Sequence, residues 1–156
     1  MSPGAEPVFR SSAQPGYSSA VSNHPGRVTA RKLPQEIDVQ FATQPCTVQT
    51  REGVVLARPG DAIVTGTAGE RWRVSRSHFS NKYQAVPPTT EGQPGRYISL
   101  PNSIMAVPMT EGFEVVLADG ASRLKGQPGD WLVDYGDGSL GIVAQTIFAT
   151  TYEVTG

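Results

Sequence analysis

The residues best suited to chemistry form one short basic segment near the middle of the chain. It runs from Arg71 to His78, and Lys82 follows four residues later. On a β-strand, Arg71 and Arg73 would share one face and Trp72 the other, because successive side chains alternate. Guanidinium groups hold phosphate or carboxylate oxygens through paired hydrogen bonds. The candidate site for a small anion or a nucleotide therefore comprises Arg71, Arg73, Arg76, His78 and Lys82.

The same segment also has a structural interpretation and a catalytic one. The arginines can pair with Glu70, with Asp38 or with the acidic second half of the chain, and clustered charges only hint at a functional site. His78 can act as a general acid or base beside Glu70 or Asp61. One histidine without a fixed partner is a weak basis for catalysis. We therefore expect a non-catalytic protein, with a small enzyme that uses His78 and a carboxylate as an alternative. No metal-ligand spacing is present, and we expect no cofactor.

An internal repeat must position these residues. The pattern from Leu33 to Tyr83 returns between Leu100 and Tyr152, with constant spacing up to Gly53 and Gly120. After a two-residue insertion, the spacing is again constant from the two Pro-Gly-Asp sequences, at 59–61 and 128–130, to the tyrosines. A fixed internal period indicates one supersecondary unit used twice.

Each copy has the pattern of a small β unit. Apolar and polar residues alternate in 37–42 and 46–50, as they do in half-buried strands. Pro-Gly-Asp predicts a type II turn whose aspartate accepts hydrogen bonds from nearby backbone N–H groups. We therefore predict a mainly β fold made of two tandem homologous units packed together, each with about four to five strands and one helical turn.

The predicted boundaries follow the repeat and the composition. The first unit covers residues 33–86 and the second covers 96–156, with a Pro- and Gly-rich linker at 87–95. Residues 1–32 are rich in Ser, Ala, Pro and Gly and hold few large apolar side chains. Such a segment buries too little apolar surface to offset the entropy of ordering, so we predict a disordered N-terminal tail.

The second copy carries its own candidate surface. Trp131 and Tyr135 can form an aromatic platform for a ligand ring. Aromatic residues in a small β unit also complete its core, so a structural role is the alternative.

Composition and charge restrict the possible partners. The net charge is −1, and acidic residues dominate the second half while the first 32 residues are basic. A dedicated nucleic-acid binder would be basic overall, so we do not expect one. Charge asymmetry supports association between copies, and a structural or assembly protein that forms homo-oligomers is therefore an alternative function.

The cellular setting is predicted from what the sequence contains. Cys46 is the single cysteine, which excludes a disulfide within the chain. No apolar run reaches the length of a membrane-spanning helix. We expect a cytoplasmic protein that does not contact membranes.

The second Pro-Gly-Asp region resembles a known family. It reads Pro128-Gly-Asp-Trp-Leu-Val-Asp-Tyr-Gly-Asp-Gly138, followed by Gly141-Ile-Val143, Phe148 and Thr151-Tyr-Glu153. This pattern resembles the PGDYG-motif family of uncharacterised bacterial and phage proteins, and the repeat suggests two tandem copies of the motif. The first copy departs from the pattern at Ala62, where a larger residue is usual. The resemblance implies no particular activity and transfers no catalytic residue. We expect an interaction or ligand-binding module whose partner is a small anion or a protein.

Overall fold

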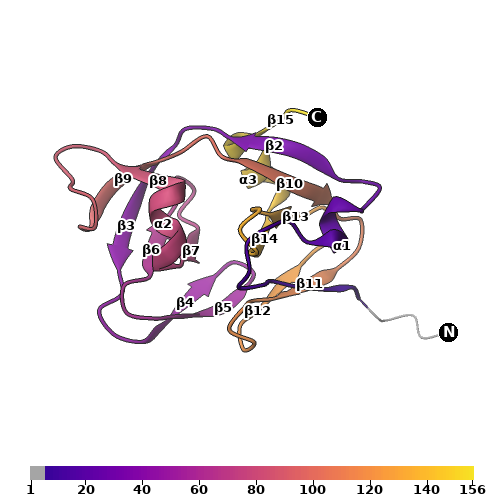
Figure 1. The fold of residues 1–156 in the computed structure, drawn as a ribbon, viewed down its shortest axis with the longest axis horizontal. Helices are drawn as coiled ribbons and strands as arrows, with labels where there is room; N and C mark the ends of the chain where they lie inside the picture. Colours follow the sequence, from indigo (N-terminus) through magenta and orange to yellow (C-terminus); the bar gives the residue numbers. More distant parts are fainter. Residues whose placement is uncertain (1–5) are drawn as a thin grey trace. The chain divides into compact units, whose positions relative to one another are not determined.

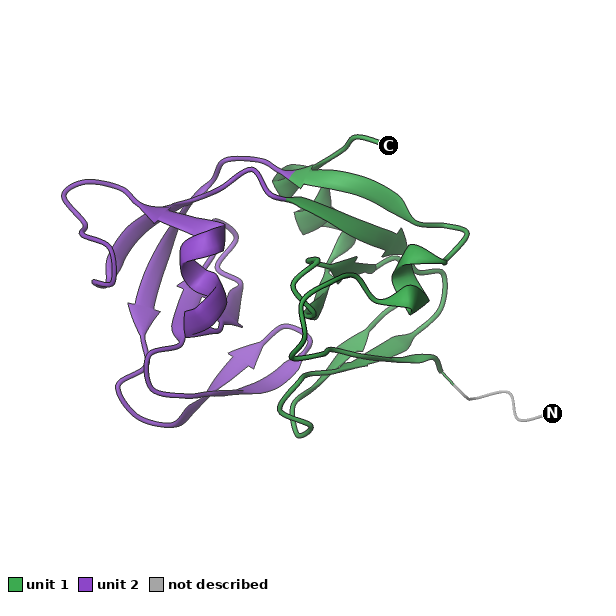
Figure 2. Cartoon of the chain, in the orientation of Figure 1, with its two compact units in different colours: residues 1–31, 103–156 green, residues 32–102 purple. Residues whose placement is uncertain are grey.

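The computed structural model describes residues 6–156 and is mainly β, as predicted. The chain divides into two compact units (Figure 2). Unit 1 combines the N-terminal residues up to Arg31 with Ser103–Gly156, and unit 2 comprises Lys32–Asn102. The first and the last described residues therefore belong to the same unit.

Unit 2 contains a five-stranded sheet, a separate hairpin and one helix (Figure 1). In spatial order, the strands of the sheet are β7 (Arg71–Val74), β6 (Ala62–Thr65), β3 (Glu36–Phe41), β9 (Gly95–Ser99) and β8 (Tyr83–Ala85). The hairpin joins β4 (Cys46–Thr50) to β5 (Gly53–Ala57), and the helix is α2 (Arg76–Lys82).

Unit 1 contains a sheet of the same kind, a three-stranded sheet and two helices. In spatial order, the strands of its five-stranded sheet are β14 (Leu140–Val143), β13 (Trp131–Asp134), β10 (Ser103–Pro108), β2 (Val28–Lys32) and β15 (Tyr152–Val154). The three-stranded sheet comprises β1 (Val8–Arg10), β11 (Phe113–Val116) and β12 (Arg123–Gly126), and the helices are α1 (Ser19–Ser22) and α3 (Gln145–Thr151).

Alternating side chains build the core of each five-stranded sheet. In β3, Ile37 and Val39 are buried between exposed neighbours, and Tyr97 on the adjacent β9 is fully buried. Phe79 of α2 lies edge-on to Tyr97, with ring centroids 5.0 Å apart. The strands therefore form because one of their faces is covered by the helix and its aromatic residues.

The two sheets have the same spatial order of corresponding strands. β7, β6 and β3 correspond in the repeat to β14, β13 and β10, and β8 corresponds to β15. The remaining strands, β9 and β2, each lie directly before a copy in the sequence but belong to the sheet of the other copy. β2, which precedes the first copy, pairs with β10, whereas β9 pairs with β3. The strand β2, which precedes the first copy, thus completes the sheet of the second copy.

The structure of residues 6–32 corrects the prediction that they belong to a disordered tail. These residues contain β1, α1 and β2, with Val21 and Ala30 fully buried. The composition gave no sign of this order, because the stabilising contacts come from strands about 70 residues or more away in sequence. Residues 1–5 of the predicted tail lie outside the described residues.

The expected linker also differs from the structure. Residues 87–95 lie within unit 2, where the Tyr97 hydroxyl donates to Gln93 O at 2.7 Å and accepts from Gly92 N at 3.0 Å. β9 then begins at Gly95 and joins the first sheet. Because the strands are exchanged, the boundaries of the compact units do not coincide with those of the repeat.

Candidate functional site

The first Pro-Gly-Asp turn organises the basic segment of unit 2. Gly60 has a φ of +90°, which a side chain would resist, and Asp61 N donates to Arg58 O at 3.0 Å. The buried Asp61 carboxylate accepts the N–H of Arg58 at 2.9 Å through Oδ2 and that of Arg76 at 3.1 Å through Oδ1. Asp61 therefore fixes the turn, as the turn chemistry predicts, and also binds the first N–H of α2, which the sequence did not predict.

Arg73 is committed to this same turn. Its guanidinium Nη1 lies 3.6 Å from Asp61 Oδ2 and donates to Leu56 O at 3.3 Å. The side chain is only 21% exposed, and its buried Nε has no hydrogen-bond partner among the described residues. The structure thus supports the structural interpretation for Arg73, which links β7 to the turn and to the hairpin.

Arg71 and Arg76 are placed differently. Both side chains are exposed, and neither forms an ion pair with any residue from 6 to 156. Arg76 lies at the start of α2, where its aliphatic part packs over Gly60; a Cβ there would lie 2.9 Å from its Cδ. These two guanidinium groups are the members of the predicted set best able to reach a partner's acidic groups.

His78 and Lys82 complete the predicted set. His78 lies on α2, and its Nδ1 is 3.1 Å from the hydroxyl of Ser75, the residue before the helix. Lys82 is the last residue of α2. A basic residue at a helix C-terminus interacts favourably with the helix dipole. The five predicted residues are therefore spread over β7 and the two ends of α2, and Arg73 is held within the unit.

One cluster in unit 2 is absent from the sequence-based predictions. The Nζ atom of Lys32 lies 5.7 Å from the centroid of the Trp72 ring and 5.3 Å from that of the Tyr83 ring. It also donates to the Tyr83 hydroxyl at 3.3 Å. Lys32 falls in the predicted disordered tail, so no signal in the sequence links it to the aromatic residues. Its ammonium group stabilises this edge of the unit through cation–π contacts.

The hairpin of unit 2 carries exposed apolar side chains. Val54 is 49% exposed and Leu56 is 46% exposed. They alternate along β5 and lie directly opposite Gln49 and Thr47 of β4. We call the surface formed by these four residues the hairpin face. The opposite face is buried, with Val48 and other apolar residues packed together.

The corresponding hairpin of unit 1 has a charged surface instead. Arg123 and Lys125 occupy the positions of Val54 and Leu56, and Glu114 occupies that of Thr47. Arg123 pairs with Glu114, and Lys125 pairs with Glu6 at 3.4 Å. The repeat thus conserves the backbone of the hairpin, while the character of its outer face changes from charged to apolar.

The aromatic candidates in unit 1 lie against its core. Trp131 stacks on Phe148 with ring centroids 4.0 Å apart and an interplanar angle of 7°. Trp131 and Tyr135 are both half-buried and pack against the buried cluster that contains Phe148. This placement supports a structural role; their use as a ligand platform stays a prediction.

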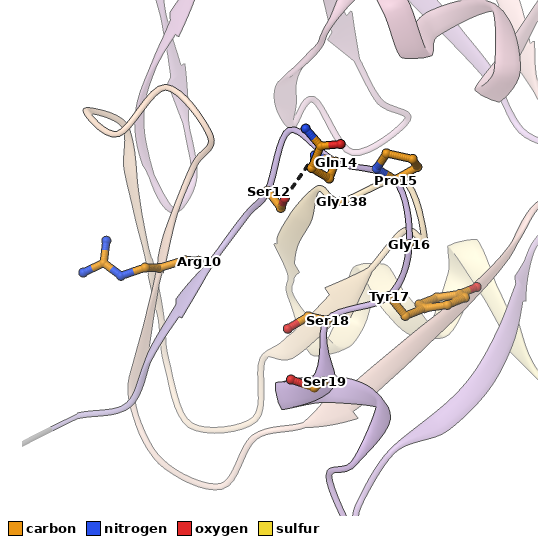
Figure 3. Close-up of a pocket in the computed structure, with 9 residues that line it drawn as sticks. All are labelled: Arg10, Ser12, Gln14, Pro15, Gly16, Tyr17, Ser18, Ser19 and Gly138. Carbon is orange, nitrogen blue, oxygen red and sulfur yellow. Dashed lines mark hydrogen bonds between the residues drawn. The ribbon is translucent and has the colours of Figure 1, made fainter.

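A shallow pocket of about 300 Å³ lies in unit 1, along the N-terminal segment (Figure 3). Its lining residues are Arg10, Ser12, Gln14, Pro15, Gly16, Tyr17, Ser18, Ser19 and Gly138. Arg10 points away from the other lining residues, and the Tyr17 hydroxyl donates to Ser103 O at 3.4 Å. The lining contains no carboxylate or histidine, so it lacks the usual pair of groups for acid–base chemistry.

A buried carboxylate beneath this segment holds it in place. Asp134 is fully buried and accepts the N–H of Ser18 at 2.7 Å and that of Gly136 at 3.0 Å. Burial raises the pKa of Asp134, although the two hydrogen bonds oppose this change. Asp134 therefore links β13 to Ser18, the residue that precedes α1, and its role is structural.

These features define a small, mainly β protein built from two units of similar topology. The chain belongs to the PGDYG protein family, whose model matches residues 53–153. This match confirms the resemblance and runs as one span through parts of both units. No curated protein and no solved structure is similar enough to the chain to count as a match.

Two kinds of feature are absent from the described part of the chain. No helix within residues 6–156 is long and apolar enough to cross a membrane. In the same part of the chain, no three His, Cys, Asp or Glu residues are grouped so that they could hold a metal ion.

Proposed function

We propose that the protein is a non-catalytic binding module whose partner, another protein, contacts unit 2 at the hairpin face. The observation that carries this proposal is the exposure of Val54 and Leu56 side by side on one strand. Exposed apolar side chains that gather on one surface are typical of protein-interaction sites. The charged residues at the same positions in unit 1 indicate that the fold itself does not require apolar residues there.

Basic groups complete the proposed binding surface. Arg73 of β7 donates to the backbone oxygen of Leu56, which places its guanidinium group at the β5 edge of the hairpin. Arg71 lies on the same strand and is exposed without an ion pair among residues 6–156. A partner with apolar side chains flanked by a carboxylate or phosphate group would complement this arrangement. The single cysteine of the chain supports a reducing compartment such as the cytoplasm.

A comparison of variants tests this proposal. The wild-type chain, Leu56→Ser and Val54→Ser are each used to capture proteins from a cell extract, and Val154→Ser is the matched control. Val154 is 52% exposed but lies on β15 of unit 1. We expect the two hairpin variants to lose partners that the wild type and the control retain. Equal recovery of partners by all four proteins would show that the hairpin face is not the binding surface.

A free anion at Arg71 and Arg76 is a second candidate, favoured by their lack of ion pairs among the described residues. A thermal-shift screen against nucleotides and polyanions tests it. A ligand that binds the native state alone raises the unfolding free energy by about 2.7 kcal/mol at a hundredfold excess over its Kd. A shift that is lost in Arg71→Ala/Arg76→Ala would support this candidate. If no ligand in the screen shifts the midpoint, the anion candidate is contradicted and only the protein-binding proposal remains. Light scattering of the purified chain tests homo-oligomerisation.

A further inference from the structure

In unit 1, the edge of the hairpin strand β11 is occupied by another strand. β1 runs parallel to β11, with Phe9 opposite Val115. Glu114 N donates to Pro7 O at 3.0 Å, and Ser11 N donates to Val116 O at 2.8 Å. Phe9 also lies edge-on to Phe113, with ring centroids 6.3 Å apart. A short extended segment thus adds to this edge through backbone hydrogen bonds and one aromatic contact.

In unit 2, the corresponding strand β4 pairs only with β5. Thr47 and Gln49 occupy the positions of Glu114 and Val116. In an antiparallel pair, alternate residues direct their backbone groups away from the partner strand. No described residue forms a hydrogen bond with the backbone groups of Thr47 and Gln49. We call these outward-directed groups the β4 edge.

The side chains beside the two edges also differ: they are charged beside the occupied edge and apolar beside the unoccupied one. The occupied edge in unit 1 adjoins the ion pair between Arg123 and Glu114. The unoccupied β4 edge adjoins the exposed apolar residues Val54 and Leu56. Proteins normally protect an open strand edge with charged residues or cover it. An open edge flanked by apolar side chains is the feature that strand-adding partners use, because the backbone supplies affinity and alternate side chains supply specificity.

We propose that the β4 edge of unit 2 binds an extended peptide segment of a partner protein, which adds parallel to β4 as β1 adds to β11. This inference rests on the proposed function and states how the partner binds. A second copy's β1 is a poorer occupant, because leaving its own β11 would break the hydrogen bonds described above.

The chemistry of the segment follows from the residues that differ between the two edges. Cys46 occupies the position of Phe113, and its smaller side chain leaves more space than the Phe113 ring does for an aromatic or long aliphatic side chain at the position of Phe9. Pro45 stands at the position of Gly112, over which the side chain of Glu6 lies in unit 1. The segment therefore carries a small residue there and an apolar residue three positions later.

A labelled peptide provides the direct test. The probe has the sequence of residues 6–12 with the substitution Glu6→Gly, and its binding to the full chain is followed by fluorescence anisotropy. We expect saturable binding that falls at least tenfold when the phenylalanine of the probe is replaced by serine. Absence of saturable binding would overturn the inference, because this probe has all the features that it requires.

Substitutions in the chain show which edge is used. Thr47→Pro removes an outward N–H from the β4 edge. Val54→Pro is the matched control, because it removes an outward N–H from the opposite edge of the hairpin, on β5. Loss of one or two backbone hydrogen bonds predicts at least tenfold weaker binding for Thr47→Pro and little change for Val54→Pro. Thr47→Lys/Gln49→Lys is a second variant that retains every backbone donor in case the proline disturbs folding. It places charges along the edge, and we again expect weaker binding.

The outcomes separate this inference from the proposed function. Unchanged probe binding by the folded Thr47 variants would overturn strand addition. If capture of partners still depended on Leu56, the hairpin face would remain the binding surface. A chain that light scattering shows to be a dimer, and that becomes monomeric in the Thr47 variants, would identify a second copy as the occupant and would also overturn the inference as stated.

Discussion

Trp72 in unit 2 and Tyr135 in unit 1 each lie against a glycine of their own unit. The two aromatic residues come from opposite arms of the corresponding hairpins. A Cβ at Gly66 would lie 2.9 Å from Trp72 Cζ3, and a Cβ at Gly141 would lie 2.9 Å from the Tyr135 hydroxyl oxygen. Gly66 and Tyr135 correspond in the repeat, as do Trp72 and Gly141. Each unit therefore pairs one aromatic ring with one glycine, and the two copies have exchanged the strands that carry them.

This exchange predicts compensation between two substitutions. Tyr135→Gly should lower the free energy of unfolding by about 2 kcal/mol, because a half-buried ring is lost. Adding Gly141→Trp to Tyr135→Gly should recover part of that loss, since it recreates the arrangement of unit 2. Urea unfolding of the two single variants and the double variant measures their coupling. A double variant no more stable than the sum of the single effects would contradict the exchange.

The Pro-Gly-Asp turns predict unequal costs for one substitution. Asp61→Ala should cost about 3 kcal/mol, because it leaves the largely buried Arg73 without its acidic partner. Asp130→Ala should cost less, about 1–2 kcal/mol, because Ile142 stands where Arg73 stands in unit 2. Chemical denaturation of both variants makes the comparison. Equal losses would show that the ion pair adds nothing to the hydrogen bonds of the turn.

The raised pKa of Asp134 predicts a change of stability with pH. Because the folded state holds the proton more tightly, stability from this group is present below the ordinary value of 3.8 and is lost as pH rises through the raised pKa. Asp134→Asn cannot ionise and lacks this loss. The stability of the variant relative to the wild type should therefore increase with pH across that window. Urea titrations at several pH values test this, and parallel curves would contradict it.

The exchanged strand predicts a severe effect of truncation. A chain that begins at residue 33 lacks β2, which lies between β10 and β15 and contains the fully buried Ala30. Unit 1 should then unfold and become sensitive to protease, because the interior of its sheet is opened. Limited proteolysis and circular dichroism report the result. A truncated chain with the wild-type content of strand would restore the view of these residues as a dispensable tail.

The local elements of this fold were predictable from sequence. Alternation in 37–42 and 46–50 predicted β3 and β4, and the Pro-Gly-Asp sequences predicted turns with a positive φ at Gly60 and Gly129. Aspartates that bind backbone N–H groups followed from the same turn chemistry. These predictions succeed because side-chain alternation and backbone preferences act over a few residues.

The arrangement of the candidate site was only partly predictable. The basic residues of 71–82 were predicted as one group. The sequence did not indicate their separation into the buried pair of Arg73 with Asp61 and the exposed Arg71 and Arg76. The hairpin face was missed, although the contrast of Val54 with Arg123 is visible when the two copies are aligned. Burial depends on which segments cover a strand, which periodicity alone does not report.

The sequence by itself determined that the chain repeats a β unit, where its turns lie and which residues alternate toward a core. The tertiary structure alone decided that β2 completes the sheet of the second copy, that Lys32 meets Trp72, and that β4 keeps an open edge while β11 does not. The physical reason is that strands pair through backbone hydrogen bonds common to all residues, so the choice among distant partners depends on the packing of the whole chain.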